Sequence, residues 1–183
     1  MKMLKKLLAI VLTGAMALTL LTACGSNAVT EKDIVDAMNE MVKAIEMNVT
    51  FTPRAKEREM AKAIAALSDE ELKELEESLK NSSLPEKAKE ILRIHPGGEN
   101  ETSSFVWCGV TYTDRFGVSG QAAQFTSQVL NDDDAANKDN LRNKKSADTH
   151  YMGTALYKTV DKNGKQVTVR VIVVTAEAEE DNG

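Results

Sequence analysis

The amino-acid sequence predicts an α+β fold, in which a helical N-terminal half is followed by a strand, a helix and a β-hairpin. Two patterns carry this prediction. Between residues 30 and 92 apolar residues recur at helical spacing, whereas alternate valines from Val167 to Val173 follow the period of a β-strand. The tetrad Asp161-Lys-Asn-Gly164 suits a tight turn and joins this strand to the segment before it. We therefore expect a long hairpin whose valine face is covered by a helix or another strand.

Residues 1–23 have the pattern of a targeting segment. A basic start with Lys2, Lys5 and Lys6 precedes an apolar run over residues 7–21, which is too short for a comfortable membrane span. The run ends in Leu21-Thr-Ala-Cys24, which resembles the bacterial lipoprotein signal, where the cysteine thiol is acylated and becomes the first mature residue. We expect lipid on Cys24 and an extracytoplasmic, membrane-anchored protein. The alternative is an ordinary secretory signal with an incidental cysteine.

The chain that follows this segment is long enough for one domain with a proper core. Removing 23 residues, which include three lysines and no acidic residue, leaves 160 residues with a net charge of −8. A negative chain without a basic patch argues against nucleic acid as a partner. Since Cys24 would be acylated, Cys108 is the one remaining thiol, so no internal disulfide is expected.

Start signals divide the first half into helices. Residues 24–29 are expected to be a short tether, and the domain is expected over residues 30–176. Four helix starts are predicted, at Thr30-Glu-Lys-Asp33, Thr52-Pro53, Ser68-Asp-Glu-Glu71 and Ser83-Leu-Pro-Glu86. His95-Pro-Gly-Gly98 should end the fourth helix, because neither proline nor paired glycines continue one.

The second half changes character. Residues 105–113 are rich in aromatic and β-branched side chains and predict a strand. Ser119 is expected to cap a helix over residues 120–130. A polar stretch over residues 131–145 fits a short helix or an ordered loop before the hairpin. Residues 177–183 predict a disordered acidic tail.

Few residues suggest chemistry. His95 and His150 are the two histidines and stand at no ligand spacing, so no metal or cofactor is predicted. The run Asp132-Asp-Asp134 lacks the glycine and glutamate of a calcium loop and is better explained as a solvated or capping segment. Cys108 beside a base such as His150 would make a nucleophile, although a strand cysteine next to a tryptophan is more often buried.

Three stretches in the C-terminal half carry a resemblance to a known family. They are the helix Gln121-Ala-Ala-Gln-Phe-Thr-Ser-Gln-Val-Leu-Asn-Asp132, the motif Asn137-Lys-Asp-Asn-Leu141 and the strand Thr149-His-Tyr-Met-Gly-Thr-Ala-Leu-Tyr157. In order and spacing they resemble the CAP superfamily, which includes the cysteine-rich secretory proteins and plant pathogenesis-related proteins. Family members run from a helix through a Gly-His-Arg-x-Asn-Leu-like motif into a glycine-containing strand and a terminal hairpin. The resemblance implies an α–β–α sandwich with the hairpin in the central sheet.

The departures from the family pattern bear on function. Asn137 stands where the family motif has its cavity histidine, and no histidine precedes His95 to match that of the family's first helix. Gly98-Glu99-Asn100 copies a family stretch but lies too far upstream of the helix at Gln121. The His/Glu cavity that can bind divalent metal in the family therefore looks dismantled, and a binding or scaffolding module is expected.

The candidate ligand cleft consists of Asn137, His150 and Cys108, and the partner is an envelope protein or a small ligand. Two alternatives stay open. An envelope hydrolase would use Cys108 or carboxylates gathered by the fold. A small ligand-binding lipoprotein would have an unrelated α+β fold.

Overall fold

The computed structural model describes residues 29–79, 84–94, 104–141, 143–161 and 163–181. The helices are α2 (Glu31–Ala44), α3 (Ala55–Ala65), α4 (Asp69–Leu79), α5 (Glu86–Ile91) and α6 (Val118–Val129), with 3-10 turns η1 (Asp132–Asp134) and η2 (Lys138–Asn140). The strands are β1 (Thr50–Pro53), β2 (Ser104–Tyr112), β3 (Lys144–Val160) and β4 (Gln166–Glu180). The predicted α+β class is thus confirmed. The predicted signal segment, Cys24, His95–Gly98 and Glu99 lie outside the described residues.

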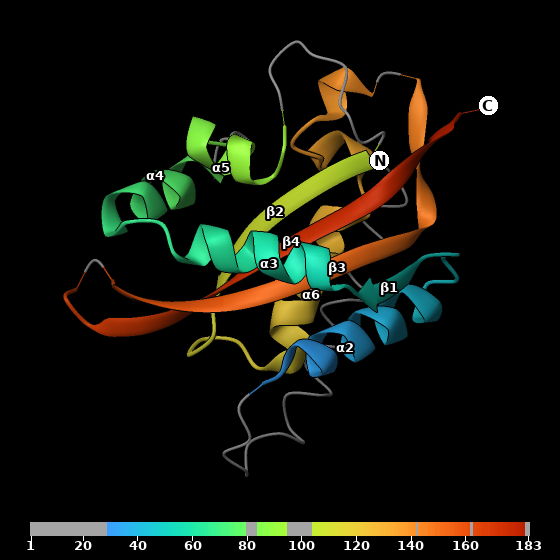
Figure 1. The fold of residues 1–183 in the computed structure, drawn as a ribbon. Helices are drawn as coiled ribbons and strands as arrows, with labels where there is room; N and C mark the ends of the chain where they lie inside the picture. Colours follow the sequence, from blue (N-terminus) through green and yellow to red (C-terminus); the bar gives the residue numbers. More distant parts are fainter. Residues whose placement is uncertain (1–28, 80–83, 95–103, 142, 162, 182–183) are drawn as a thin grey trace.

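The strands form one mixed sheet in the order β1-β3-β4-β2 (Figure 1). β3 and β4 are the predicted hairpin, antiparallel from Lys144↔Glu180 to Val160↔Gln166. At the turn the carboxylate of Asp161 accepts hydrogen bonds from two backbone N–H groups, and Gly164 adopts a φ of 78°, which favours glycine. β2 pairs antiparallel with β4, and the short β1 pairs parallel with β3.

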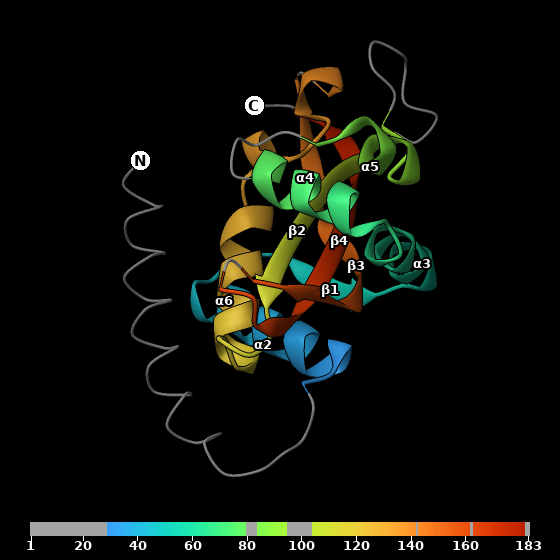
Figure 2. The same cartoon turned by 90° about the vertical axis from the view of Figure 1, so that its left-hand side faces the viewer.

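Helices cover both faces of the sheet because β4 is apolar on both sides. The alternate valines from Val167 to Val173 pack with α3, α4 and α5, which confirms the predicted valine face. Ile172, Val174 and Ala176 pack with α2 and α6 on the opposite face. Figure 2 shows α3 and α6 on the two sides of the sheet. This double burial explains why the middle of β4 reads as a nearly continuous apolar run.

The predicted helix start at Thr52-Pro53 is wrong, because these residues end strand β1. The buried ring of Phe51 anchors β1, and the side chain of Asn39 both accepts from and donates to the Phe51 backbone, at 2.7 and 2.9 Å. Asn39 therefore takes the place of a further strand at this edge. α3 begins only at Ala55, after Arg54 has donated its N–H to the carbonyl of Met152.

The predicted disordered tail is wrong for residues 177–180, which belong to β4. β3 begins at Lys144, within the segment predicted as a loop, and its first residues face the acidic end of β4. Lys144 pairs with Glu180 in register, with 3.5 Å between Nζ and Oε1, and Lys145 faces Glu179. Opposite charges on neighbouring strands thus extend the hairpin where the composition alone suggested fraying.

Two capping boxes are confirmed and a third cap is not. The Thr30 hydroxyl accepts from the N–H of Asp33, whose carboxylate accepts from the N–H of Thr30. The same exchange links Ser68 and Glu71 at the start of α4. At α6, however, Gly117 is the N-cap, since its carbonyl accepts the first helical hydrogen bond, from Gln121. Ser119, the predicted cap, lies inside the first turn of α6.

Candidate functional site

His150 lies in the core of the face that α2 and α6 cover. It is 1% exposed, and its ring stacks on Trp107 with centroids 5.2 Å apart and meets the edge of Phe51 at 5.4 Å. The small side chain of Ala176, which pairs in register with His150, leaves room for these rings to meet above β4. Neither ring nitrogen has a hydrogen-bond partner within the described part of the chain, and burial lowers the pKa of His150. The imidazole is therefore held neutral and is not open to a ligand.

Asn137 satisfies the free edge of β2. Its Oδ1 accepts from the N–H of Val106 at 3.0 Å and its Nδ2 donates to the carbonyl of Ser104 at 2.9 Å. Two glutamines of α6 continue this role further along β2, at the carbonyls of Cys108 and Val110. Asn137 is 3% exposed, so both ends of its amide are used inside the protein. Asn137 therefore has a structural role in this fold.

Cys108 is buried on the face opposite His150. It packs with the valines of β4 and with α3–α5, whereas Trp107, which stacks on His150, packs with α2 and α6. Successive residues of a strand point to opposite faces, so the sheet itself separates the thiol from the imidazole. Burial raises the pKa of the Cys108 thiol to about 12, which keeps it protonated near neutral pH. The pair required for a cysteine nucleophile is not formed.

The predicted cleft of Asn137, His150 and Cys108 is therefore not assembled. A hollow of about 290 Å³ near the edge of β2 is lined by Cys108 together with Leu79, Leu84, Ser127, Gln128, Asp134 and Ala136. Neither Asn137 nor His150 lines this hollow. Its volume lies at the lower end of the range for small-ligand sites, about 300 Å³ upwards.

The acidic run Asp132–Asp134 follows α6, and one of its carboxylates binds the backbone at the start of β3. Asn131 caps η1 by accepting from the N–H of Asp133, and the carboxylate of Asp132 accepts from the N–H of Ser146 at the start of β3. Among the described residues, no group of three or more His, Cys, Asp or Glu side chains is placed to hold a metal ion. The side chain of Asp132 thus binds the backbone of β3, whereas the cap of η1 comes from Asn131.

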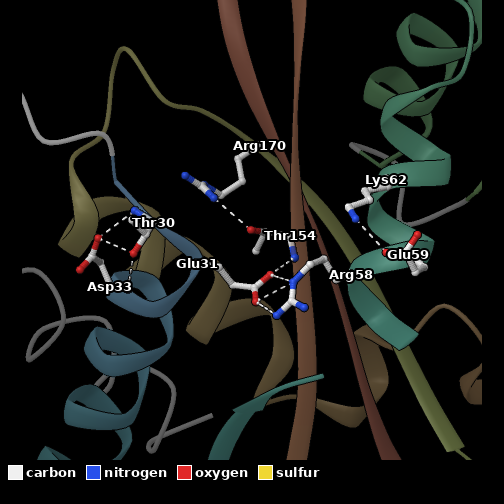
Figure 3. Close-up of polar contacts among 8 residues, drawn as sticks. All are labelled: Thr30, Glu31, Asp33, Arg58, Glu59, Lys62, Thr154 and Arg170. Atoms are coloured by element: carbon white, nitrogen blue, oxygen red, sulfur yellow. Dashed lines mark hydrogen bonds and ion pairs between the residues drawn. The ribbon is translucent and has the colours of Figure 1, made fainter. Parts of the chain in front are cut away.

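The sequence did not single out a polar network that joins the first turn of α2 to the sheet (Figure 3). Glu31 accepts from the N–H of Thr154 at 2.7 Å and from the guanidinium of Arg58 on α3. α3 lies directly on β3 at Gly153, where a Cβ atom would come within 2.0 Å of the backbone nitrogen of Arg58. Only glycine permits this close approach.

Arg170 is the centre of the polar contacts on the face of the sheet that α2 and α6 cover. Its side chain donates to Gln121 at 2.9 Å, to the hydroxyl of Thr154 at 3.0 Å and to the carbonyl of Val29 at 2.6 Å. Burial lowers the pKa of Arg170, but a guanidinium remains charged at physiological pH. In the sequence, the signal of this network is the charged Arg170 within the alternating valines of β4. Arg170 therefore joins α6, β3 and the start of the described chain.

Among the described carboxylates, the most buried one is held by hydrogen bonds. Glu57 is fully buried and accepts hydrogen bonds from Arg54 and, at 2.8 Å, from the hydroxyl of Thr175. Burial by itself would raise the pKa of Glu57, but these hydrogen bonds outweigh it and hold the pKa below its ordinary value. An acid catalyst needs the opposite shift. Glu57 thus acts as a structural anion between α3 and β4.

The chain matches no protein-family model, and no curated protein or solved structure is significantly similar to it. None of the helices in the described ranges has the length and apolar character needed to cross a bilayer. The functional assignment therefore depends on the sequence patterns and on the contacts above.

Proposed function

We propose that this protein is a lipoprotein, held outside the cytoplasm by lipid on Cys24, whose CAP-like domain acts as a binding or scaffolding module at the cell envelope. The observation that carries the proposal is the sequence Leu21-Thr-Ala-Cys24 after a basic and apolar segment. Small residues before the cysteine give a signal peptidase access to the bond, and the thiol is the nucleophile that accepts the lipid. Covalent lipid provides membrane affinity without a spanning helix.

The order of elements supports the CAP-like part of the proposal. Helix α6 leads through the turns η1 and η2 into β3, which contains Gly153 and forms the terminal hairpin with β4. This is the order that the family resemblance implies. Helices also lie on both faces of the sheet, as expected for an α–β–α arrangement.

The positions of the candidate residues favour binding over hydrolysis. Cys108 and His150 are buried on opposite faces of the sheet, and Asn137 is engaged by the backbone of β2. Glu57 is engaged by Arg54 and Thr175. A nucleophile–base pair requires hydrogen-bond reach between the two groups, which Cys108 and His150 do not have. A role carried by the surface of the domain fits these contacts better.

Fractionation of cells that express cysteine variants tests this proposal. Cys24→Ala should abolish labelling by a radioactive fatty acid and move the protein from the membrane fraction to the soluble fraction. Cys108→Ala is the matched control, because it removes the other thiol and should leave both labelling and location unchanged. If Cys24→Ala protein remained membrane-bound in high salt, the lipoprotein assignment would be wrong.

A further inference from the structure

Exposed apolar side chains gather at the turn end of the β3–β4 hairpin. Among the described residues four large hydrophobic side chains are exposed, and three of them lie here: Phe116 at 43%, Leu156 at 52% and Val160 at 53%. We call these three residues the hairpin patch. Leu156 and Val160 alternate with Lys158 along β3, so all three point to the face that α2 and α6 occupy. Phe116 packs on the first turn of α6, where its Cβ and the ring carbon Cδ1 would lie 3.2 Å from a Cβ on Gly120.

Arg170 links the hairpin patch to Val29, the first described residue of the chain. Leu156 pairs in register with Arg170, whose guanidinium binds the carbonyl of Val29 at 2.6 Å. Arg170 also binds Gln121, and Gln121 donates to the carbonyl of Phe116 at 2.7 Å. The same buried arginine therefore links Val29 to the loop that carries Phe116.

The distance from Cys24 restricts which side of the domain can meet the membrane. Five residue steps separate Cys24 from Val29, and a chain of this length spans at most about 18 Å. A domain of this size is roughly 40 Å across, as its expected radius of gyration implies. With lipid on Cys24, the end of the domain that holds Val29 is near the bilayer, whereas α4 packs on the opposite face of the sheet.

We propose that the hairpin patch of Phe116, Leu156 and Val160 rests on the surface of the bilayer that holds the lipid of Cys24, and so fixes the orientation of the domain. This inference rests on the proposed lipidation. Aromatic and aliphatic side chains partition into the headgroup region, and the ammonium of Lys158 reaches lipid phosphates from the same face. Among the described charges beside the turn, Arg115 pairs with Asp161 and Lys165 with Asp114, each at 3.8 Å. Contact through the three apolar side chains is expected to persist in high salt.

A second copy of the chain fits this surface less well. Twofold pairing of two β3 edges centred on Lys158 would place two Lys158 side chains opposite each other. Like charges directly opposite on neighbouring strands are destabilising. The bilayer imposes no such repulsion, and for this reason we assign the hairpin patch to lipid.

Quenching of tryptophan fluorescence by brominated lipids tests the inference. The lipidated mature protein is placed in vesicles of phosphatidylethanolamine and phosphatidylglycerol, and the probe is Phe116→Trp. Trp107 is 1% exposed and gives the same background in every variant. The matched control is Lys73→Trp at an exposed position of α4 on the far face. We expect brominated lipid to reduce the emission of the Phe116→Trp probe at least twofold and to leave that of Lys73→Trp at the wild-type level.

Further substitutions separate the possible outcomes. Adding Leu156→Asn and Val160→Asn to the Phe116→Trp protein should remove at least half of the quenching, since both side chains are exposed and their loss leaves the core intact. Membrane-bound protein with equal quenching at the two probe positions overturns the inference while the lipidation stands. Protein that never enters the vesicle fraction overturns both. A dimer of the unlipidated domain that the two asparagine substitutions abolish assigns the patch to a second copy and likewise overturns the inference.

Discussion

His150 should make the stability of the fold depend on pH. Its ring is buried between Trp107 and Phe51, and neither nitrogen is hydrogen-bonded within the described chain. Burial lowers the folded-state pKa below the ordinary value of 6.5, and the backbone at Asp148 and Val129 together with the carboxylates of Asp132 and Asp148 opposes this only in part. As the pH falls, the unfolded chain therefore takes up the proton before the folded protein does. The stability that depends on neutral His150 is complete above pH 6.5 and is lost as the pH falls toward the folded-state pKa.

The size of this effect follows from proton linkage. Linkage limits this loss to about 1.4 kcal/mol per pH unit, so between pH 7.5 and 5.5 the free energy of unfolding should fall by up to about 1.4 kcal/mol through His150. His150→Phe keeps an aromatic ring in the same place and removes the titration. Urea unfolding followed by circular dichroism at several pH values measures the difference between the two proteins. Carboxylates titrate in both and cancel in the comparison. Wild-type and variant curves that run parallel across this range would refute the reasoning.

Three further substitutions test the packing by thermal or urea unfolding. Gly153→Ala should destabilise the domain by about 1–3 kcal/mol, because the new methyl group meets the α3 backbone; Gly117→Ala, with open space at the new methyl, should cost less. Val171→Asp should unfold the domain, since it places a carboxylate in the buried valine face, and an unchanged melting temperature would contradict that placement. Asn137→Ala should cost about 1–3 kcal/mol by leaving the Val106 N–H and the Ser104 carbonyl without their partner; unaltered stability would mean that water replaces the amide.

The hairpin was predictable because its signals are local. Alternate valines and a turn tetrad lie next to each other in the sequence, and the structure forms both. β1 was not predictable in this way. It has four residues, one of which is buried, and its partner strand begins pairing at Thr149, far along the chain. Its Thr-Pro pair also matches a helix start, so the local signal favoured the wrong element.

The candidate site was less predictable, because the face of the sheet on which each residue lies depends on how the strands are paired. The order of Trp107 and Cys108 already places them on opposite faces. Which of those faces His150 joins depends on how β3, β4 and β2 align, and that alignment is set by long-range pairing. Arg170 shows the same limit. Its position in β4 was visible, but its bond to Val29 joins residues 141 positions apart.

Zinc titration together with cleavage assays tests most directly the claim that this domain binds rather than hydrolyses. Chelator-treated mature protein would be titrated calorimetrically with zinc, calcium and magnesium, and then incubated with peptide and peptidoglycan substrates. The account predicts no micromolar zinc binding and no metal-dependent cleavage, because His150 is enclosed by aromatic rings and Asn137 is held by the backbone of β2. Micromolar zinc binding that His150→Phe abolishes, together with metal-dependent cleavage, would contradict the account and make the protein a hydrolase.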